Sequence, residues 1–276
     1  MNEIKLDKFK QEIARAYDRR QSSYDLGKAG SWHHDLACRL VECADLQRGD
    51  KVLDLATGTG MVALEAAQKV GASGKVIGVD ISSGLLAVAR QKVAEAELGD
   101  RIILQLADVE ALSFAKNSFD CILCCSALPL FTDVPRDLLL WRTFLVPQGK
   151  LGLCVFAETA FVHGVVLQKV ARRYGINLTM SDLTGTPAKC RSLFEAAGYK
   201  DIEIITEQYG SYITLEPSAS KSWDTSLQHP YCSPLLNLPT QELEEAKAEY
   251  INELEALVTE QGVWNDITTY FVIAKK

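Results

Sequence analysis

Residues 52–62 read VLDLATGTGMV and combine a strand, a glycine turn and the start of a helix. The branched apolar residues of the first half are typical of a buried strand. Gly58 and Gly60 allow a tight turn with positive φ, and apolar residues recur at helical spacing from Met61 onward. This unit is typical of α/β folds that bind a nucleotide at the carboxyl end of a parallel sheet.

The alternation of strand and helix patterns continues along the chain. Up to residue 158 we expect strands over 51–56, 75–80, 101–107, 118–125 and 149–158, and helices over 61–70, 84–98 and 133–146. Beyond it we expect helices over 158–175, 186–200 and 238–262, strands over 201–207 and 267–276, and mostly irregular chain over 208–239. Helices near the amino terminus are expected over 1–17 and 31–44. The alternation implies right-handed crossovers and a parallel sheet covered on both faces.

The composition narrows the class of protein. The formal net charge of the 276 residues is -7, which argues against a nucleic acid as the main partner. No run approaches the roughly 20 apolar residues of a membrane span, and the first residues do not resemble a signal peptide. We therefore expect a cytoplasmic protein whose 8 cysteines are mostly free thiols. Cys121-x-x-Cys124 lies in an apolar strand without a second cysteine pair, so we predict no metal site.

The glycine turn leaves several nucleotides open. A P-loop is excluded because no Gly-Lys-Ser/Thr follows the turn. The spacing Gly58-x-Gly60-x-x-Ala63, with Asp80 at the end of the second strand, fits a dinucleotide fingerprint. However, Asp54 lies in the first strand just below the turn. A carboxylate there would repel a pyrophosphate and would attract an ammonium group.

Further polar residues follow the third and fourth expected strands. Asp108 lies where an acceptor could meet the exocyclic amine of an adenine, and Ser126 follows the fourth strand. A ligand that meets carboxylates at the ends of three strands needs an amine, a ribose and an adenine. S-adenosylmethionine has these three groups. An NAD-dependent oxidoreductase and a non-catalytic module that binds an adenosine cofactor stay open as alternatives.

Four sequence motifs then resemble one family in the right order. VLDLATGTG, VIGVDIS, LQLADVEALSF with NSFDCILCCSAL, and FLVPQGKLGL resemble class I S-adenosylmethionine-dependent methyltransferases, particularly the ubiquinone/menaquinone C-methyltransferases and natural-product methyltransferases. The resemblance implies a Rossmann-like α/β fold: a seven-stranded, mostly parallel sheet with an antiparallel last strand and helices on both faces. It also implies a helical N-terminal cap over 1–49 and a core over 50–276. We expect insertions at about 158–186 and 208–262 to form the acceptor pocket.

The resemblance also assigns roles to individual residues. The turn around the methionine part of the cofactor comprises Asp54, Ala56, Thr57, Gly58, Thr59 and Gly60. Around the adenosine part it places Asp80, Ile81, Ala107, Asp108 and Val109, with Ser126 beside the sulfonium. The resemblance does not assign Tyr24, which lies in the cap and could close over the cofactor, with packing as the alternative. Asp108 could instead cap a helix, and Ser126 could simply end its strand.

The sequence says less about the methyl acceptor than about the cofactor. We expect a small, moderately apolar metabolite, because Phe161, Val162, Val165, Leu167, Tyr209, Tyr212 and Trp223 lie in the two insertions. His33, His34 and His163 are the candidates for a catalytic base, with a structural role as the alternative for each. The segment SALPLFTD departs from the polar pattern of quinone methyltransferases and argues against a quinone. The sequence does not indicate whether O, N or C is methylated, nor the oligomeric state.

Overall fold

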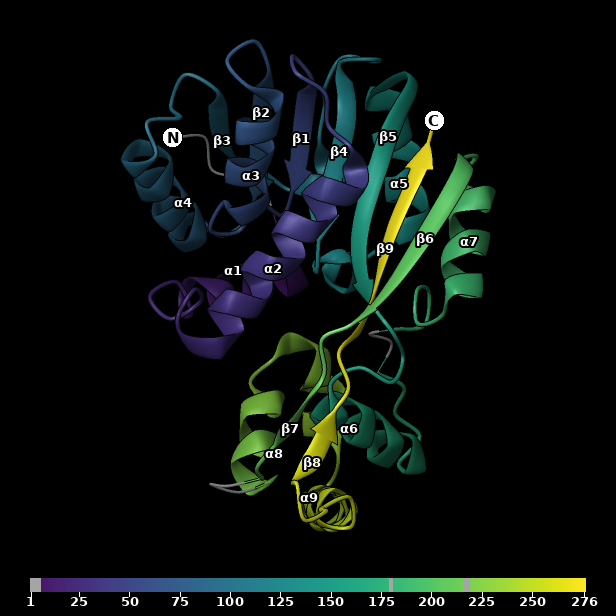
Figure 1. The fold of residues 1–276 in the computed structure, drawn as a ribbon. Helices are drawn as coiled ribbons and strands as arrows, with labels where there is room; N and C mark the ends of the chain where they lie inside the picture. The colour runs from purple at the N-terminus through teal and green to yellow at the C-terminus, as the bar shows by residue number, and fades with distance from the viewer. Residues whose placement is uncertain (1–5, 179–180, 216–218) are drawn as a thin grey trace. The chain divides into compact units, whose positions relative to one another are not determined.

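The structure is a computed structural model that describes residues 6–178, 181–215 and 219–276 (Figure 1). Residues 1–5 of the expected first helix, residues 179–180 of the first insertion and residues 216–218 of the second lie outside the described residues. The chain divides into two compact units. The first comprises Met1–Val155, Pro187–Ile205 and Tyr270–Lys276, and the second comprises Phe156–Thr186 and Thr206–Thr269.

A seven-stranded sheet forms the centre of the first unit. In spatial order its strands are β3 (Ile102–Leu106), β2 (Lys75–Asp80), β1 (Lys51–Leu55), β4 (Phe119–Cys125), β5 (Leu145–Phe156), β9 (Thr268–Lys275) and β6 (Lys200–Gln208). The strands from β3 to β5 pair in parallel, and the last strand, β9, runs antiparallel (Figure 1). The predicted fold class is confirmed. The strand order reverses between β1 and β4, and ligands of such sheets bind at the carboxyl ends of the strands there.

Helices flank this sheet, and local sequence signals fix most of their ends. They are α3 (Met61–Val70), α4 (Ser83–Glu95), α5 (Val134–Phe144) and α7 (Pro187–Ala196), with short 3-10 turns η1 (Val109–Ala111) and η2 (Leu128–Leu130). The side chain of Ser82 caps α4 by accepting from the Leu85 N–H. β5 already starts at Leu145, so the prediction of residue 149 was wrong. β5 pairs with β4 from the Phe119–Leu145 pair onward. Pro147 lies close to this start, and proline is unfavourable inside a strand, so the sequence does not indicate the early beginning.

Two N-terminal helices belong to the first unit. They are α1 (Lys8–Asp18) and α2 (Gly27–Ala44), and α2 begins four residues before the predicted start. Within the unit, α1 contacts α4, and α2 contacts α3 and β4. The buried side chains Leu36, Leu40 and Ala44 recur at helical spacing and anchor α2 to the core.

The second unit has its own hydrophobic core. It contains α6 (Val162–Arg173), β7 (Ser211–Ile213), α8 (Ala219–Leu227), the 3-10 segment η3 (Pro230–Asn237), α9 (Thr240–Glu255) and β8 (Val263–Asn265). The prediction of mostly irregular chain over 208–239 was therefore wrong. Trp223 and Leu235 from that stretch are buried in one cluster with Tyr250 of α9. This tertiary packing outweighs the local signal of four prolines.

The same cluster includes one face of the acidic helix α9 and corrects a further expectation. In α9, Ala246, Tyr250 and Leu254 form a buried face. Val162, Leu167 and Trp223, expected at the acceptor pocket, are core residues of the second unit. In the described part of the chain, no helix has the length and apolar character needed to cross a membrane.

Candidate functional site

Two adjoining cavities open at the carboxyl ends of the parallel strands. The first has about 700 Å³ of space and the second about 410 Å³, each partly open to solvent. They share Tyr24, Ala56, Gly58, Cys125 and Ser126, so they form one continuous site. Ala56 follows β1 and Ser126 follows β4, which places the site at the reversal of strand order. A volume of this order suits a cofactor of moderate size.

Most of the predicted cofactor residues line these cavities. Those in the lining are Tyr24, Asp54, Ala56, Thr57, Gly58, Thr59, Asp80, Ile81, Asp108, Val109 and Ser126. Gly60 caps α3, and the Ala107 N–H donates to the Asp80 carbonyl at 2.9 Å; neither residue is part of the lining. The structure thus brings together residues that lie 102 positions apart in the chain, from Tyr24 to Ser126.

The glycine turn is held by the carboxylate of Asp80. Gly58 has a φ of +55° and Gly60 a φ of +83°, which glycine adopts without steric cost. The N–H groups of Gly58 and Ser82 each donate to Asp80 at 2.8 Å. Burial raises the pKa of Asp80 to about 6, against the effect of these N–H groups. One carboxylate therefore fixes both the turn after β1 and the start of α4.

Asp54 is a deeply buried acid in the lining of the second cavity. It is 1% exposed and accepts a hydrogen bond from the Thr57 hydroxyl. Burial raises the pKa of Asp54 to about 7, and the nearby charge of Asp80 adds to the effect. Among the described residues, no cationic side chain pairs with Asp54. A cation in the second cavity would favour its charged form.

In the first cavity, both oxygens of the Asp108 carboxylate already accept hydrogen bonds from other residues of the protein. The Lys10 ammonium donates to one of its oxygens at 2.7 Å and also contacts Glu110. The other oxygen accepts from the Glu110 N–H at 3.0 Å, so Asp108 also caps η1. Burial of Lys10 works against its charge, but the bonds to Asp108 and Glu110 outweigh it and raise its pKa. Any adenine amine at this position must share Asp108 with Lys10.

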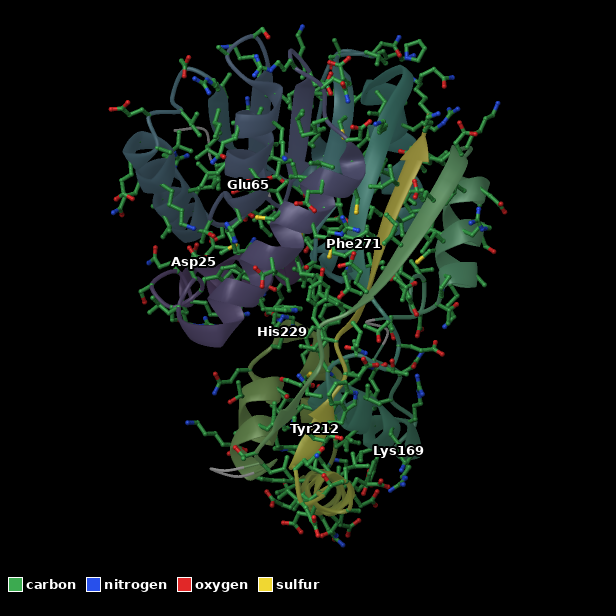
Figure 2. The ribbon with its side chains drawn as sticks, in the orientation of Figure 1. Asp25, Glu65, Lys169, Tyr212, His229 and Phe271 are labelled. Carbon is green, nitrogen blue, oxygen red and sulfur yellow. The ribbon has the colours of Figure 1, made fainter. Side chains whose placement is uncertain are left out.

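Acidic side chains dock the N-terminal segments onto the site. Asp18 accepts from the Ser82 hydroxyl at 2.6 Å and from the Gly84 N–H at 2.8 Å. Asp25, which is labelled in Figure 2, accepts from the Thr59 hydroxyl at 2.8 Å and pairs with Lys92 at 2.6 Å. These contacts and Lys10 were missed in the sequence, because each acid reaches a partner more than 30 positions away.

Aromatic rings line the site next to these contacts. The rings of Tyr17 and Tyr24 lie 6.2 Å apart, with the Arg20 guanidinium over both at 5.3 and 5.4 Å. The Tyr24 ring stacks on His33 at 4.9 Å, with an interplanar angle of 2°. Tyr24 therefore contacts both the cap and the second cavity.

The ends of β1 and β4 carry backbone strain. Ala56 has a φ of +52° and Ser126 a φ of +59°, in a region that costs a non-glycine residue about 1–3 kcal/mol. Both residues face the two cavities. Cys121 and Cys124 are buried, whereas Cys125 lines both cavities. Cys125 was overlooked because the cysteine-rich strand reads as uniformly apolar.

The three candidate histidines occupy different places. His33 lines the second cavity, and its burial lowers its pKa. His34 lies beside Cys38 and Glu65 instead of in either lining. His163 belongs to the second unit, where its Nδ1 lies 2.8 Å from the Ser222 hydroxyl. Only His33 of the three lies at the cavities of the first unit.

The comparisons with known proteins agree with this geometry. Residues 52–149 match the family model described as a methyltransferase domain. Over 150 residues the chain is 35% identical to demethylmenaquinone methyltransferase of Symbiobacterium thermophilum, covering 54% of this chain and 58% of that protein. Residues 52–149 form a class I methyltransferase domain. This agrees with the predicted family, enzyme class and cofactor.

Further relatives match the chain at similar identity. The chain is 28% identical over 179 residues to the ubiquinone/menaquinone biosynthesis C-methyltransferase of Cellvibrio japonicus, covering 64% of this chain and 71% of that protein. It spans about half the length of several further relatives of that description.

Solved structures share the fold at low sequence identity. Phosphoethanolamine N-methyltransferase 2 of Haemonchus contortus, in complex with S-adenosyl-L-methionine, has a TM-score of 0.60 at 18% identity, covering 98% of this chain and 60% of that one. The [4+2]-cyclase SpnF has a TM-score of 0.58 at 16% identity, covering 100% and 99%. Proteins described by different reactions thus share the methyltransferase fold, so the reaction must be argued from the site.

Proposed function

We propose that the protein transfers a methyl group from S-adenosylmethionine to a small, moderately apolar metabolite. The observation that carries this proposal is Asp54, a buried carboxylate at the second cavity without a cationic partner among the described residues. A buried acid of this kind is costly unless a ligand compensates it. The ammonium group of S-adenosylmethionine is such a ligand.

The remaining lining residues fit the rest of this cofactor. In the proposal, Asp80 holds the ribose hydroxyls, while Ile81 and Val109 pack against the adenine. Asp108, shared with Lys10, accepts from the adenine amine. The glycine turn lets the backbone approach the methionine part closely.

Asp54 also disfavours a dinucleotide. The phosphates of NAD would lie at the glycine turn, where Asp54 presents a carboxylate that is 1% exposed. Repulsion between like charges is strong where solvent is excluded. The comparisons do not favour an oxidoreductase either.

When bound, the cofactor supplies an electrophilic methyl group on a sulfonium. The chain itself then has to hold the acceptor in line with that methyl group and keep water away. We assign the exclusion of water to Tyr17 and Tyr24, which line the first cavity. A hydroxyl or amine acceptor must also lose a proton. His33 can accept it, since its lowered pKa keeps the imidazole neutral at neutral pH.

The acceptor proposal rests on the apolar wall beside Ser126. Leu130 and Phe131 of the SALPLFTD segment line the first cavity together with Cys125 and Ala127. Such a wall suits an apolar metabolite. The relatives carry the names of quinone methyltransferases. The apolar SALPLFTD segment, however, departs from the polar pattern expected of that group, so we do not propose a quinone as the acceptor. Contributions of the insertions to the acceptor pocket, a cytoplasmic location and the absence of a nucleic-acid partner stay predictions.

Calorimetry followed by a transfer assay tests the proposal. We expect the purified protein to bind S-adenosylmethionine and S-adenosylhomocysteine, but not NADH. Incubation of the protein with S-adenosylmethionine carrying a labelled methyl group and a metabolite extract should yield a labelled small molecule by mass spectrometry. Binding of the cofactor without any labelled product would favour a non-catalytic module. The absence of cofactor binding would refute both the methyltransferase and the non-catalytic module.

A further inference from the structure

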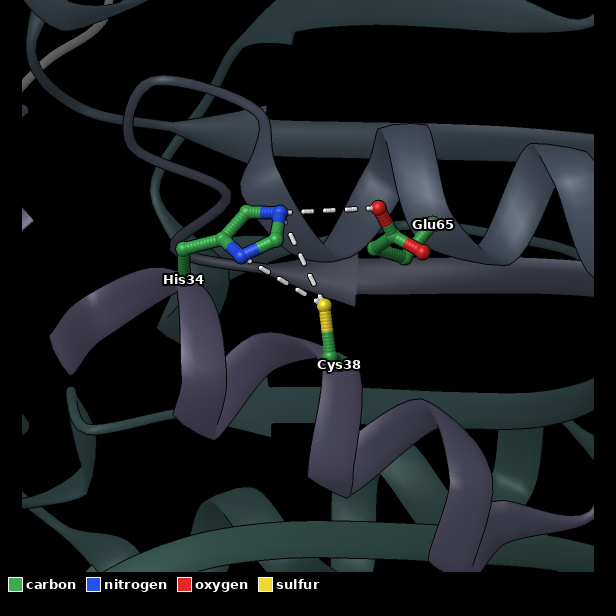
Figure 3. A group of neighbouring side chains, drawn as sticks. All are labelled: His34, Cys38 and Glu65. Carbon is green, nitrogen blue, oxygen red and sulfur yellow. Dashed lines mark hydrogen bonds and ion pairs between the residues drawn. The ribbon is translucent and has the colours of Figure 1, made fainter. Parts of the chain in front are cut away.

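A second cluster of reactive side chains lies on α2 and α3. His34 and Cys38 are four positions apart on α2, so their side chains share one helix face. Glu65 of α3 points toward them from the neighbouring helix (Figure 3). This trio is outside the linings of both cavities. Because the third residue comes from another helix, the sequence shows only a His-x-x-x-Cys pair and does not reveal the cluster.

The spacing of the potential ligand atoms is that of a metal site. Cys38 Sγ lies 3.6 Å from His34 Nε2, and His34 Nε2 lies 3.7 Å from Glu65 Oε1. All three ligand atoms are within 4.8 Å of one another. A tetrahedral zinc with Zn–N of about 2.0–2.1 Å and Zn–S of about 2.3 Å needs an N to S separation of about 3.6 Å. The corresponding N to O separation is about 3.4 Å, so the pairs that His34 makes with Cys38 and with Glu65 are already close to the separations that one ion requires.

We propose that His34, Cys38 and Glu65 bind one zinc-type divalent cation. A thiolate, an imidazole and a carboxylate are ligands that Zn²⁺ takes, and the closely related Co²⁺ takes the same set. On binding, the Cys38 thiol releases its proton to solvent, and the metal–sulfur bond takes its place. The two anionic ligands then neutralise the charge of the ion. The side chain of His34 is 55% exposed, so the fourth position is open to water.

The ion would join the N-terminal cap to the core of the first unit. α2 carries His33 and Ala37 in the lining of the second cavity, and α3 begins with Met61 and Val62 in the same lining. A metal held by both helices would fix their relative position beside the cofactor site. Its role is therefore to order the cap, and it requires no particular reaction at the cavities.

Titration of the metal-free protein with Co²⁺ tests this site directly. We expect one equivalent to produce a thiolate-to-cobalt charge-transfer band and the visible absorption of tetrahedral cobalt, both abolished by excess Zn²⁺. Cys38→Ser should remove the charge-transfer band, and His34→Gln and Glu65→Gln should each weaken binding at least tenfold. Cys43→Ser is the matched control on the same helix and should behave as the unchanged protein.

Thermal unfolding gives a second readout that is independent of enzyme activity. Zn²⁺ should raise the melting temperature of the unchanged protein and of Cys43→Ser, but not that of Cys38→Ser. The melting temperature without metal identifies any variant that is destabilised by itself. A wild-type titration without a charge-transfer band, or equal loss of the band in Cys43→Ser and Cys38→Ser, would overturn the proposal.

Discussion

Replacing Asp54 with Asn should stabilise the protein without cofactor and weaken cofactor binding. Burial raises the pKa of Asp54 from an ordinary 3.8 to about 7. Between these values the folded state keeps a proton that the unfolded state has lost. The free energy of unfolding therefore falls as pH rises, by about 1.4 kcal/mol per pH unit. The accumulated loss above pH 7 is up to about 4 kcal/mol.

The asparagine avoids this loss and keeps the local hydrogen bond. Its amide oxygen can still accept from the Thr57 hydroxyl, but the side chain cannot ionise. Urea unfolding of both proteins near pH 8 and near pH 4 measures the difference. We expect Asp54→Asn to be more stable near pH 8 by up to about 4 kcal/mol, and nearly equal near pH 4.

Cofactor binding should respond in the opposite direction. Loss of a buried partner of the ammonium group costs about 2 kcal/mol or more, so calorimetry near pH 8 should show at least about 30-fold weaker binding of S-adenosylmethionine. Asp137→Asn is the matched control. Burial and Glu110 raise the pKa of Asp137 to about 8, so this variant should also gain stability at high pH, with cofactor affinity retained. Cofactor affinity unchanged in Asp54→Asn, or stability near pH 8 below that of the unchanged protein, would refute the reasoning.

Three further variants address other parts of the site. Asp80→Asn should weaken cofactor binding more than tenfold by calorimetry, and retained affinity would exclude its ribose role. His33→Asn should lower kcat by about 10²–10⁴-fold for a hydroxyl or amine acceptor, while the cofactor affinity changes little. An unchanged kcat with such an acceptor would exclude His33 as the general base. Asp18→Ala removes the acceptor for the Ser82 hydroxyl and the Gly84 N–H. It should lower the free energy of unfolding by about 2 kcal/mol and speed amide exchange in α1, and unaltered exchange would contradict the docking role.

The fold of the first unit was predictable because its signals are local. Each strand from β1 to β4 is a short apolar run, and Ser82 and Asp133, which cap α4 and α5, are of residue types that favour helix starts. The positions of Asp54 and Asp80 were predictable for the same reason, because each lies at or near the end of a strand that the sequence indicates. Residues whose position depends mainly on nearby residues in the sequence could therefore be placed without a structure.

The rest depends on contacts between distant segments. Asp18 meets Ser82, 64 positions away, and Lys10 meets Asp108, 98 positions away. No periodicity in the sequence encodes such pairs. Burial of Trp223 against Tyr250 likewise orders a proline-rich stretch that looks irregular by itself.

Proton release on cofactor binding tests the role of Asp54 most directly. Near pH 6 the Asp54 carboxyl is mostly protonated without cofactor, since its pKa is about 7, and pairing with an ammonium requires its charged form. Titrations with S-adenosylmethionine in buffers of different ionisation enthalpy count the released protons. We predict release of close to one proton near pH 6 by the unchanged protein and much less by Asp54→Asn. Binding without proton release, or equal release by both proteins, would contradict the account.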